Sequence, residues 1–263
     1  MVNIHPTAIV HPKAELGEGV VIGPYVIIEE NVIIGDNTRI DAFAQIKSYT
    51  KIGKENHIFS YAYIGGAPQD LKYKGGPTRL EIGDKNIIRE YVTIHRGTEE
   101  GGEITKVGSN CLIMAYAHIA HDCIIGNRVI MANAATLGGH VIVEDNAVIG
   151  GLSAVHQFVR IGKFAYIGGM TGVSQDVPPY TLIAGERGKM YGLNIIGLKR
   201  NGFTEKQLER LKRAYRILWR SGLTREEAIK KIFEEIGDYP EINYLIEFVR
   251  KSQRGIVPAF RKK

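Results

Sequence analysis

Two histidines and an acidic residue stand close together at residues 117–123, which read Ala-His-Ile-Ala-His-Asp-Cys. The imidazole of His121 is the kind of group that takes a proton from a hydroxyl near neutral pH. Asp122 directly follows it and could orient the ring. His118 is a second candidate. The segment is aliphatic, and a histidine in such a run is more often structural than catalytic, so the surrounding pattern has to decide.

Aliphatic residues recur every six positions along most of the chain. The series is unbroken over 4–64, resumes in phase over 82–94, and continues one position later over 107–173. A period of six matches neither the 3.6-residue period of a helix nor the two-residue alternation of a strand. It is typical of a short strand and a turn that repeat, so that coils stack and one aliphatic side chain per unit enters a shared core.

Three six-residue units per coil would place residues 18 apart above one another, at a strand spacing of about 4.8 Å. His121 would then lie below Gly139 and Gln157, and Asp122 below His140. A base, an acid, a further histidine and a Gly-Gly step that a ligand can approach closely would converge from separate parts of the chain. This convergence favours a catalytic role for His121.

Two insertions interrupt the repeat. The first, at 66–81, has glycine and proline at both ends, so we expect a protruding loop rather than another coil. The second, at 95–106, is rich in glycine and in acidic residues and is also expected to protrude. Loops on a rigid scaffold often carry functional residues.

The last quarter of the chain has a helical pattern. Thr204 and Thr224 each open a capping box that leads into apolar residues at three-to-four spacing, and a third such segment covers 240–251. We therefore expect a mainly β domain over 1–194 and an α-helical domain over 195–263.

The chain has 263 residues, of which 44% are hydrophobic and 24% charged, as in globular proteins. Its net charge of +6 is uneven, because residues 1–194 carry 17 Lys and Arg against 19 Asp and Glu, whereas 195–263 carry 17 against 9. A basic C-terminal domain favours an acidic partner. Nucleic acid is not indicated, because aromatic and basic residues are not interleaved.

Without a signal peptide, a transmembrane segment or a Cys-x-x-Cys pair, we expect a cytoplasmic protein without a metal site.

Six short segments are more specific than the repeat. They are QDLKY at 69–73, TIHRG at 93–97, HIAHDC at 118–123, AVHQF at 154–158, QDVPPY at 175–180 and GLKR at 197–200. In order and spacing they resemble the acyl-carrier-protein-dependent UDP-N-acetylglucosamine O-acyltransferases that begin lipid A synthesis. The resemblance covers nearly the whole chain. It implies a left-handed parallel β-helix of hexapeptide repeats followed by a C-terminal α-helical domain.

The resemblance also implies a reaction, in which a 3-hydroxyacyl chain moves from acyl carrier protein to the 3-position of UDP-N-acetylglucosamine. His121 would be the general base, Asp122 would orient it, and the backbone N–H of Gly139 would stabilise the oxyanion. Gly169 and Met170 would form the acyl-chain ruler. The implied nucleotide-sugar contacts are Asp70, Lys72, His118, His140, His156, Gln157, Asn194 and Arg200. No cofactor is implied, because the phosphopantetheine arm of the carrier protein holds the acyl group.

Other functions remain open from sequence alone. The family has Glu where this chain has Ile196 and a second basic residue at Asn201, so a 3-amino analogue of the sugar nucleotide is an alternative acceptor. An acetyl-CoA-dependent hexapeptide transferase, a zinc carbonic anhydrase using His118 and His121, and a non-catalytic scaffold are further alternatives. The family also implies a homotrimer with sites between neighbouring β-helices, in which the 66–81 loop reaches across.

Overall fold

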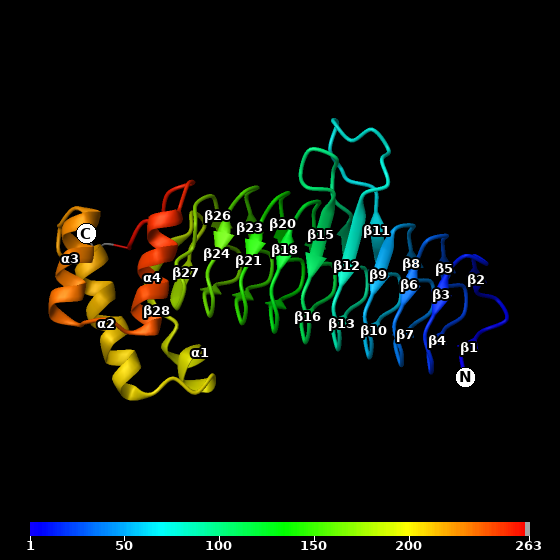
Figure 1. The fold of residues 1–263 in the computed structure, drawn as a ribbon, viewed down its shortest axis with the longest axis horizontal. Helices are drawn as coiled ribbons and strands as arrows, with labels where there is room; N and C mark the ends of the chain where they lie inside the picture. Colours follow the sequence, from blue (N-terminus) through cyan, green and yellow to red (C-terminus); the bar gives the residue numbers. More distant parts are fainter. Residues whose placement is uncertain (261–263) are drawn as a thin grey trace.

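The structure is a computed structural model that describes residues 1–260. Within those residues, 28 short strands wind into a long coil, and four helices follow at its C-terminal end (Figure 1). The sides of the coil are three sheets of 11, 9 and 8 strands, here called sheets A, B and C. Successive strands of one coil belong to different sheets, so each strand pairs with strands one coil away.

The strands of each sheet are given in chain order. Sheet A contains β1 (Asn3–Ile4), β4 (Val21–Ile22), β7 (Arg39–Ile40), β10 (His57–Ile58), β13 (Ile87–Ile88), β16 (Leu112–Ile113), β19 (Ile130–Met131), β22 (Val148–Ile149), β25 (Tyr166–Ile167), β27 (Thr181–Ala184) and β28 (Lys189–Leu193). Sheet B contains β2 (Ile9–Val10), β5 (Ile27–Ile28), β8 (Gln45–Ile46), β11 (Tyr63–Gly66), β14 (Thr93–His95), β17 (His118–Ile119), β20 (Thr136–Leu137), β23 (Ala154–Val155) and β26 (Gly172–Val173). Sheet C contains β3 (Glu15–Leu16), β6 (Ile33–Ile34), β9 (Thr50–Ile52), β12 (Arg79–Ile82), β15 (Ile104–Val107), β18 (Ile124–Ile125), β21 (Ile142–Val143) and β24 (Arg160–Ile161).

Pairing is parallel from β1 to β27, with the register that 18 residues per coil predicts. His118 in β17 pairs with Thr136 in β20, and Ile119 pairs with Leu137. Only the final pair, β27 with β28, is antiparallel among the described strands. The left-handed parallel β-helix implied by the family resemblance is confirmed.

The core is the column of aliphatic side chains that the repeat predicts. Ile64, Ile94, Ile119 and Leu137 are fully buried. Full burial of such a side chain contributes roughly 1.5–3 kcal/mol, so each coil is strongly held in one register. Because strand residues alternate in direction, burial of Ile119 turns its neighbour His118 outward.

Both insertions leave the coil where it turns from sheet B to sheet C, here called the B–C corner (Figure 1). The predicted boundaries 66–81 and 95–106 are too wide, since the loops occupy only 67–78 and 96–103. The reason is strand pairing, because β12 pairs with β15 along all four residues and β11 continues beside β14. We call 67–78 the first loop and 96–103 the second loop.

The helices of the C-terminal region are α1 (Ile195–Arg200), α2 (Glu205–Arg220), α3 (Arg225–Glu235) and α4 (Pro240–Lys251). The capping boxes predicted at Thr204 and Thr224 are confirmed by reciprocal bonds with Gln207 and Glu227. The short helix α1, capped by Asn194, was not foreseen because six residues are too few to show a helical period. Among residues 1–260, no helix is both long and apolar enough to cross a bilayer.

The region predicted as helical over 195–263 is not helical throughout. After α4 the chain returns to the β-helix, where the N–H of Val257 donates to the carbonyl of Asp176 and the N–H of Met190 donates to that of Pro258. Apolar contact with the open last coil accounts for this return, since Val257 is 2% exposed. The end of the predicted domain, 261–263, lies outside the described residues.

Candidate active site

His121 lies at a B–C corner, where the chain turns from β17 to β18. One coil on, Gly139 and His140 occupy the same corner between β20 and β21. The N–H of His140 donates to the carbonyl of His121 at 3.0 Å, and the two imidazole rings meet edge to face with centroids 5.1 Å apart. The predicted stacking of these residues is therefore confirmed.

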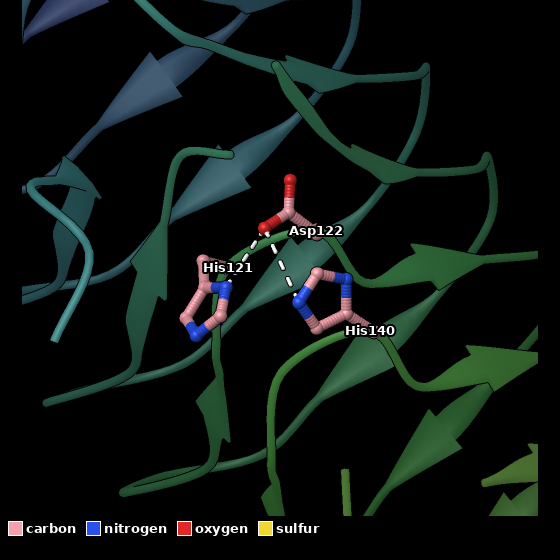
Figure 2. A group of neighbouring side chains, drawn as sticks. All are labelled: His121, Asp122 and His140. Carbon is pink, nitrogen blue, oxygen red and sulfur yellow. Dashed lines mark hydrogen bonds and ion pairs between the residues drawn. The ribbon is translucent and has the colours of Figure 1, made fainter. Parts of the chain in front are cut away.

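The carboxylate of Asp122 lies between two histidines (Figure 2). Its Oδ2 accepts a hydrogen bond from Nδ1 of His121 at 2.8 Å and lies 3.8 Å from Nε2 of His140. Asp122 and His140 both have a left-handed backbone, with φ of +59° and +60°. Aspartate tolerates this conformation better than most residues, so the corner can aim a carboxylate at the ring.

The second loop covers Asp122 and supplies further donors. The backbone N–H of Thr98 donates to Oδ1 at 3.0 Å, and the Thr98 hydroxyl donates to Oδ2 at 2.7 Å. Burial alone would raise the pKa of the Asp122 carboxyl, but the hydrogen bonds from His121 and Thr98 outweigh it and lower the pKa. Asp122 is therefore an ionised acceptor at neutral pH.

Gly139 lies against the face of the His121 ring. A Cβ at position 139 would lie 2.5 Å from Cε1 of His121 and 2.7 Å from its Nε2, so a larger residue would have to displace the ring. Glycine at position 139 therefore lets the backbone lie close to the His121 ring. The sequence predicts close approach of a ligand at this step.

The backbone N–H of Gly139 is unused within residues 1–260. At the corresponding place in another corner, the N–H of Asn127 donates to the side chain of Asp145, one coil further on, at 2.8 Å. Above Gly139 the equivalent residue is Gln157, whose exposed side chain accepts no such bond. A ligand oxygen at this corner would therefore meet a free N–H donor beside the imidazole.

Nε2 of His121 also lies near Asp70 of the first loop, whose Oδ2 is 4.0 Å away. Only 11% of the His121 side chain is exposed, whereas 28% of the Asp70 side chain is exposed. Lys72, two residues beyond Asp70, is exposed and pairs with Glu100 of the second loop at 3.3 Å. The two loops thus meet above the corner.

Two further histidines, His95 and His118, lie near His121 in strands of sheet B. The hydroxyl of Thr93 lies 2.7 Å from Nδ1 of His118, and the rings of His95 and His118 meet edge to face. Burial and the neighbouring His121 lower the pKa of His118. Burial, His118 and His121 lower the pKa of His95 to about 4. Burial also lowers the pKa of His140, against the opposite effect of Asp122. Neutral imidazoles therefore surround His121 near pH 7.

Two residues of the site carry no role in the sequence reasoning. His95 is 5% exposed, and its Nδ1 has no hydrogen-bond partner in the described part of the chain. Thr98 is 4% exposed. His95 belongs to the TIHRG segment and Thr98 directly follows it, so the segment was a signal that could have found them. Their contacts could not be predicted from the 18-residue spacing, because the insertion beside them interrupts it.

The structure does not bring all predicted site residues together. His156 and Gln157 follow β23 at the same B–C corner, two coils beyond His121, and both are exposed. Gly169 and Met170 lie at a different corner, between sheets A and B.

The remaining pair lies at the corner between sheets C and A. Asn194 caps α1 there and donates its side-chain N–H to the carbonyl of Phe164, which lies between β24 and β25. Arg200 is exposed at the end of α1. Within one chain, Asn194 and Arg200 therefore occupy a different edge of the β-helix from His121.

Three side chains could in principle hold a metal ion. His121, Asp122 and His140 offer ligand atoms within 4.8 Å of one another. The carboxylate oxygens are already occupied by donors from His121 and Thr98, which is the arrangement of a hydrogen-bonded acid–imidazole pair. His118, which the carbonic anhydrase alternative needs, bonds Thr93 and lies outside this group.

The chain matches two family models. Residues 176–257 match the model described as UDP N-acetylglucosamine O-acyltransferase, domain 2, and residues 104–139 match the bacterial transferase hexapeptide model of six repeats. The hexapeptide match includes the corner that carries His121 and ends at Gly139.

Relatives match along almost the entire chain. Acyl-[acyl-carrier-protein]–UDP-N-acetylglucosamine O-acyltransferase from Myxococcus xanthus is 50% identical over 97% of this chain and 99% of its own length. The enzyme of the same name from Anaeromyxobacter is 48% identical over 96% of this chain and 98% of its own. The solved structure of a UDP-N-acetylglucosamine acyltransferase from Bacteroides fragilis is 44% identical, with a TM-score of 0.94 over 97% of this chain and 99% of that one. This chain therefore belongs to the UDP-N-acetylglucosamine O-acyltransferase family.

Proposed function

We propose that this chain moves a 3-hydroxyacyl group from acyl carrier protein to the 3-hydroxyl of UDP-N-acetylglucosamine, the step that begins lipid A synthesis. The observation that carries the proposal is the buried His121–Asp122 pair beside the unused N–H of Gly139, in a chain of this family. A base, its orienting acid and an oxyanion donor are the three parts that acyl transfer to a hydroxyl requires.

The direction of proton transfer follows from the tautomer. An ionised Asp122 accepts from Nδ1 of His121, so that nitrogen carries the proton. Nε2 then has a free lone pair, and it lies 4.0 Å from Oδ2 of Asp70. A sugar hydroxyl bound there gives its proton to Nε2 as its oxygen attacks the thioester carbon. Asp122 stabilises the imidazolium that results.

The attacked carbonyl becomes an oxyanion and needs a donor already in place. The N–H of Gly139 is next to the ring of His121 and unused within residues 1–260. One such donor contributes about 3 kcal/mol to the stability of the transition state. When the intermediate collapses, the C–S bond breaks and His121 returns the proton to the departing phosphopantetheine thiolate.

The remaining site residues support a shared site. His118, His140, His156, Gln157, Asp70 and Lys72 lie near the B–C corner, whereas Asn194 and Arg200 lie on another edge of the same chain. We infer that Asn194 and Arg200 contact a sugar nucleotide bound at the His121 corner of a second copy. Such a site matches the homotrimer that the family implies. The excess of basic residues over 195–263 favours docking of acyl carrier protein near the C-terminal helices.

A transfer assay tests the proposal. Carrier proteins loaded with 3-hydroxyacyl chains of several lengths, and acyl-CoA and acetyl-CoA in parallel, are offered with UDP-N-acetylglucosamine or its 3-amino analogue. We expect an O-acylated product from carrier-protein donors. Failure of every carrier-protein donor with both acceptors would overturn the proposal, and product from acetyl-CoA alone would favour the acetyltransferase alternative. Amide formation alone would assign the amino sugar, as Ile196 and Asn201 allow.

A further inference from the structure

We propose that Thr98 is a positioning residue that holds the carboxylate of Asp122 in the orientation that His121 needs. The inference rests on the proposed function, because it gives the second loop a part in the same reaction. Thr98 is not expected to touch the substrate, since it is 4% exposed behind Asp122.

The contacts of Thr98 fix both carboxylate oxygens. Its N–H binds Oδ1 at 3.0 Å and its hydroxyl binds Oδ2 at 2.7 Å. Oδ2 is also the atom that accepts Nδ1–H of His121, so the hydroxyl and the imidazole share one oxygen. Rotation of the carboxylate about its Cβ–Cγ bond would break all three bonds, and the acid is therefore locked in the plane that serves His121.

The backbone of Asp122 is anchored separately. Its N–H donates to the hydroxyl of Thr105, a fully buried residue of β15, at 2.8 Å. Thr105 therefore places the main chain, whereas Thr98 orients the charged end of the side chain. Thr98 belongs to the second loop (96–103), whereas Thr105 belongs to the strand that follows it, β15.

The second loop is shaped to keep Thr98 in place. The N–H of Gly101 donates to the Thr98 hydroxyl at 3.1 Å, and the N–H of Glu103 donates to the Thr98 carbonyl at 2.9 Å. A Cβ at Gly101 would lie 2.2 Å from the carboxylate of Asp122, so only glycine lets the loop close over the acid. The loop is thus a lid on Asp122.

The same loop also holds the first loop, which faces His121 from the other side. Oε1 of Glu99 accepts the N–H of Gly76 at 2.8 Å, and Arg96 donates to the hydroxyl of Tyr73 at 2.8 Å. The neighbour of Glu99 on one side is Thr98. Residues 96–99 therefore orient the carboxylate of Asp122 and also support the first loop, which carries Asp70.

The test compares Thr98→Val, which removes the hydroxyl at nearly constant volume, with Thr98→Ser, which keeps it. We expect Thr98→Val to lower kcat about tenfold or more, since a hydrogen bond to a charged group is lost. KM should stay within about twofold, because substrate contacts are unchanged. Thr98→Ser should restore most of kcat. Thr38→Val is the matched control, as Thr38 is a buried threonine with bonds to Gly53 and Asn56, far from the site.

A double-mutant cycle tests whether Thr98 acts through Asp122. In an Asp122→Asn background, Thr98→Val should change kcat by less than about twofold, because the carboxylate it orients is gone. An equal fall in both backgrounds would overturn the inference, and so would a Thr98→Val enzyme with the kcat of wild type or a Thr98→Ser enzyme without recovery. Absence of transfer by the wild-type chain would instead refute the proposed function.

A readout without substrate keeps the two ideas separate. In protein labelled with ¹⁵N-histidine, the Nδ1–H of His121 should give a protected downfield proton resonance, because it is hydrogen-bonded and buried. Thr98→Val should broaden or abolish this resonance, and Thr98→Ser and Thr38→Val should retain it. An unchanged resonance in Thr98→Val would contradict the inference whatever the reaction proves to be.

Discussion

Gly139 and the ring of His121 are so close that a Cβ at position 139 would lie 2.5 Å from Cε1 and would have to displace the ring. The residues are 18 positions apart, one coil of the β-helix, and belong to one corner. The 18-residue coil thereby places a backbone N–H beside an imidazole.

Gly139→Ala should displace the ring of His121 while keeping the backbone N–H. We expect a fall in kcat of about 10²-fold, because the base loses its alignment with the hydroxyl. Gly151→Ala is the control, since Gly151 occupies the same turn position at another corner, and the atom nearest to its Cβ would be the carbonyl oxygen of Asn133 at 3.1 Å. The control should lose a little thermal stability and keep its rate. A Gly139→Ala enzyme with wild-type kcat would show that the ring does not need this space.

His95 should make the fold sensitive to mild acid. Burial, together with the neighbouring His118 and His121, lowers its pKa in the folded chain to about 4, from an ordinary value near 6.5. Between about pH 6.5 and pH 4 the unfolded chain binds a proton that folded His95 does not, so stability falls as pH falls through this window.

His95→Gln should therefore flatten the decline of stability between about pH 6.5 and pH 4, measured by thermal or denaturant unfolding. His5→Gln serves as control, because His5 is an exposed residue of the first coil. An identical decline in wild type and His95→Gln would contradict the assignment.

Two inactive variants should rescue each other if the site is shared between copies. Co-expressed His121→Ala and Arg200→Ala chains would form mixed assemblies in which about a quarter of the sites combine an intact His121 with an intact Arg200. Transfer activity should reappear at about that level, although each variant alone is expected to be inactive. No recovery in assemblies shown to be mixed would mean that both residues serve the same chain's site, or that Arg200 serves none.

Docking of acyl carrier protein should depend on salt. The C-terminal region from residue 195 carries 17 Lys and Arg against 9 Asp and Glu, and exposed charges are screened beyond about 8 Å at physiological ionic strength. We expect the Kd for the carrier protein to rise by about tenfold between low and high salt, measured by calorimetry. A Kd that does not change with salt would argue against electrostatic docking.

The six-residue period was sufficient to predict the β-helix and the meeting of His121, Gly139 and His140, because within uninterrupted coils an 18-residue step is a spatial address. The same arithmetic could not find Thr98, which lies 24 positions before Asp122, because the second loop breaks the count. Nor could it predict that Asn194 lies at a different corner from His121, since the six-residue period does not continue into the C-terminal helices. Loop contacts and domain packing depend on tertiary structure that no local period encodes.

The most direct test of the account is the rate of transfer from 3-hydroxyacyl carrier protein to UDP-N-acetylglucosamine by wild type and His121→Ala, with folding checked by circular dichroism and thermal unfolding. We predict that wild type forms the 3-O-acyl product and that a normally folded His121→Ala enzyme loses about 10²-fold or more in kcat. A folded His121→Ala enzyme that turns over at nearly the wild-type rate would contradict it.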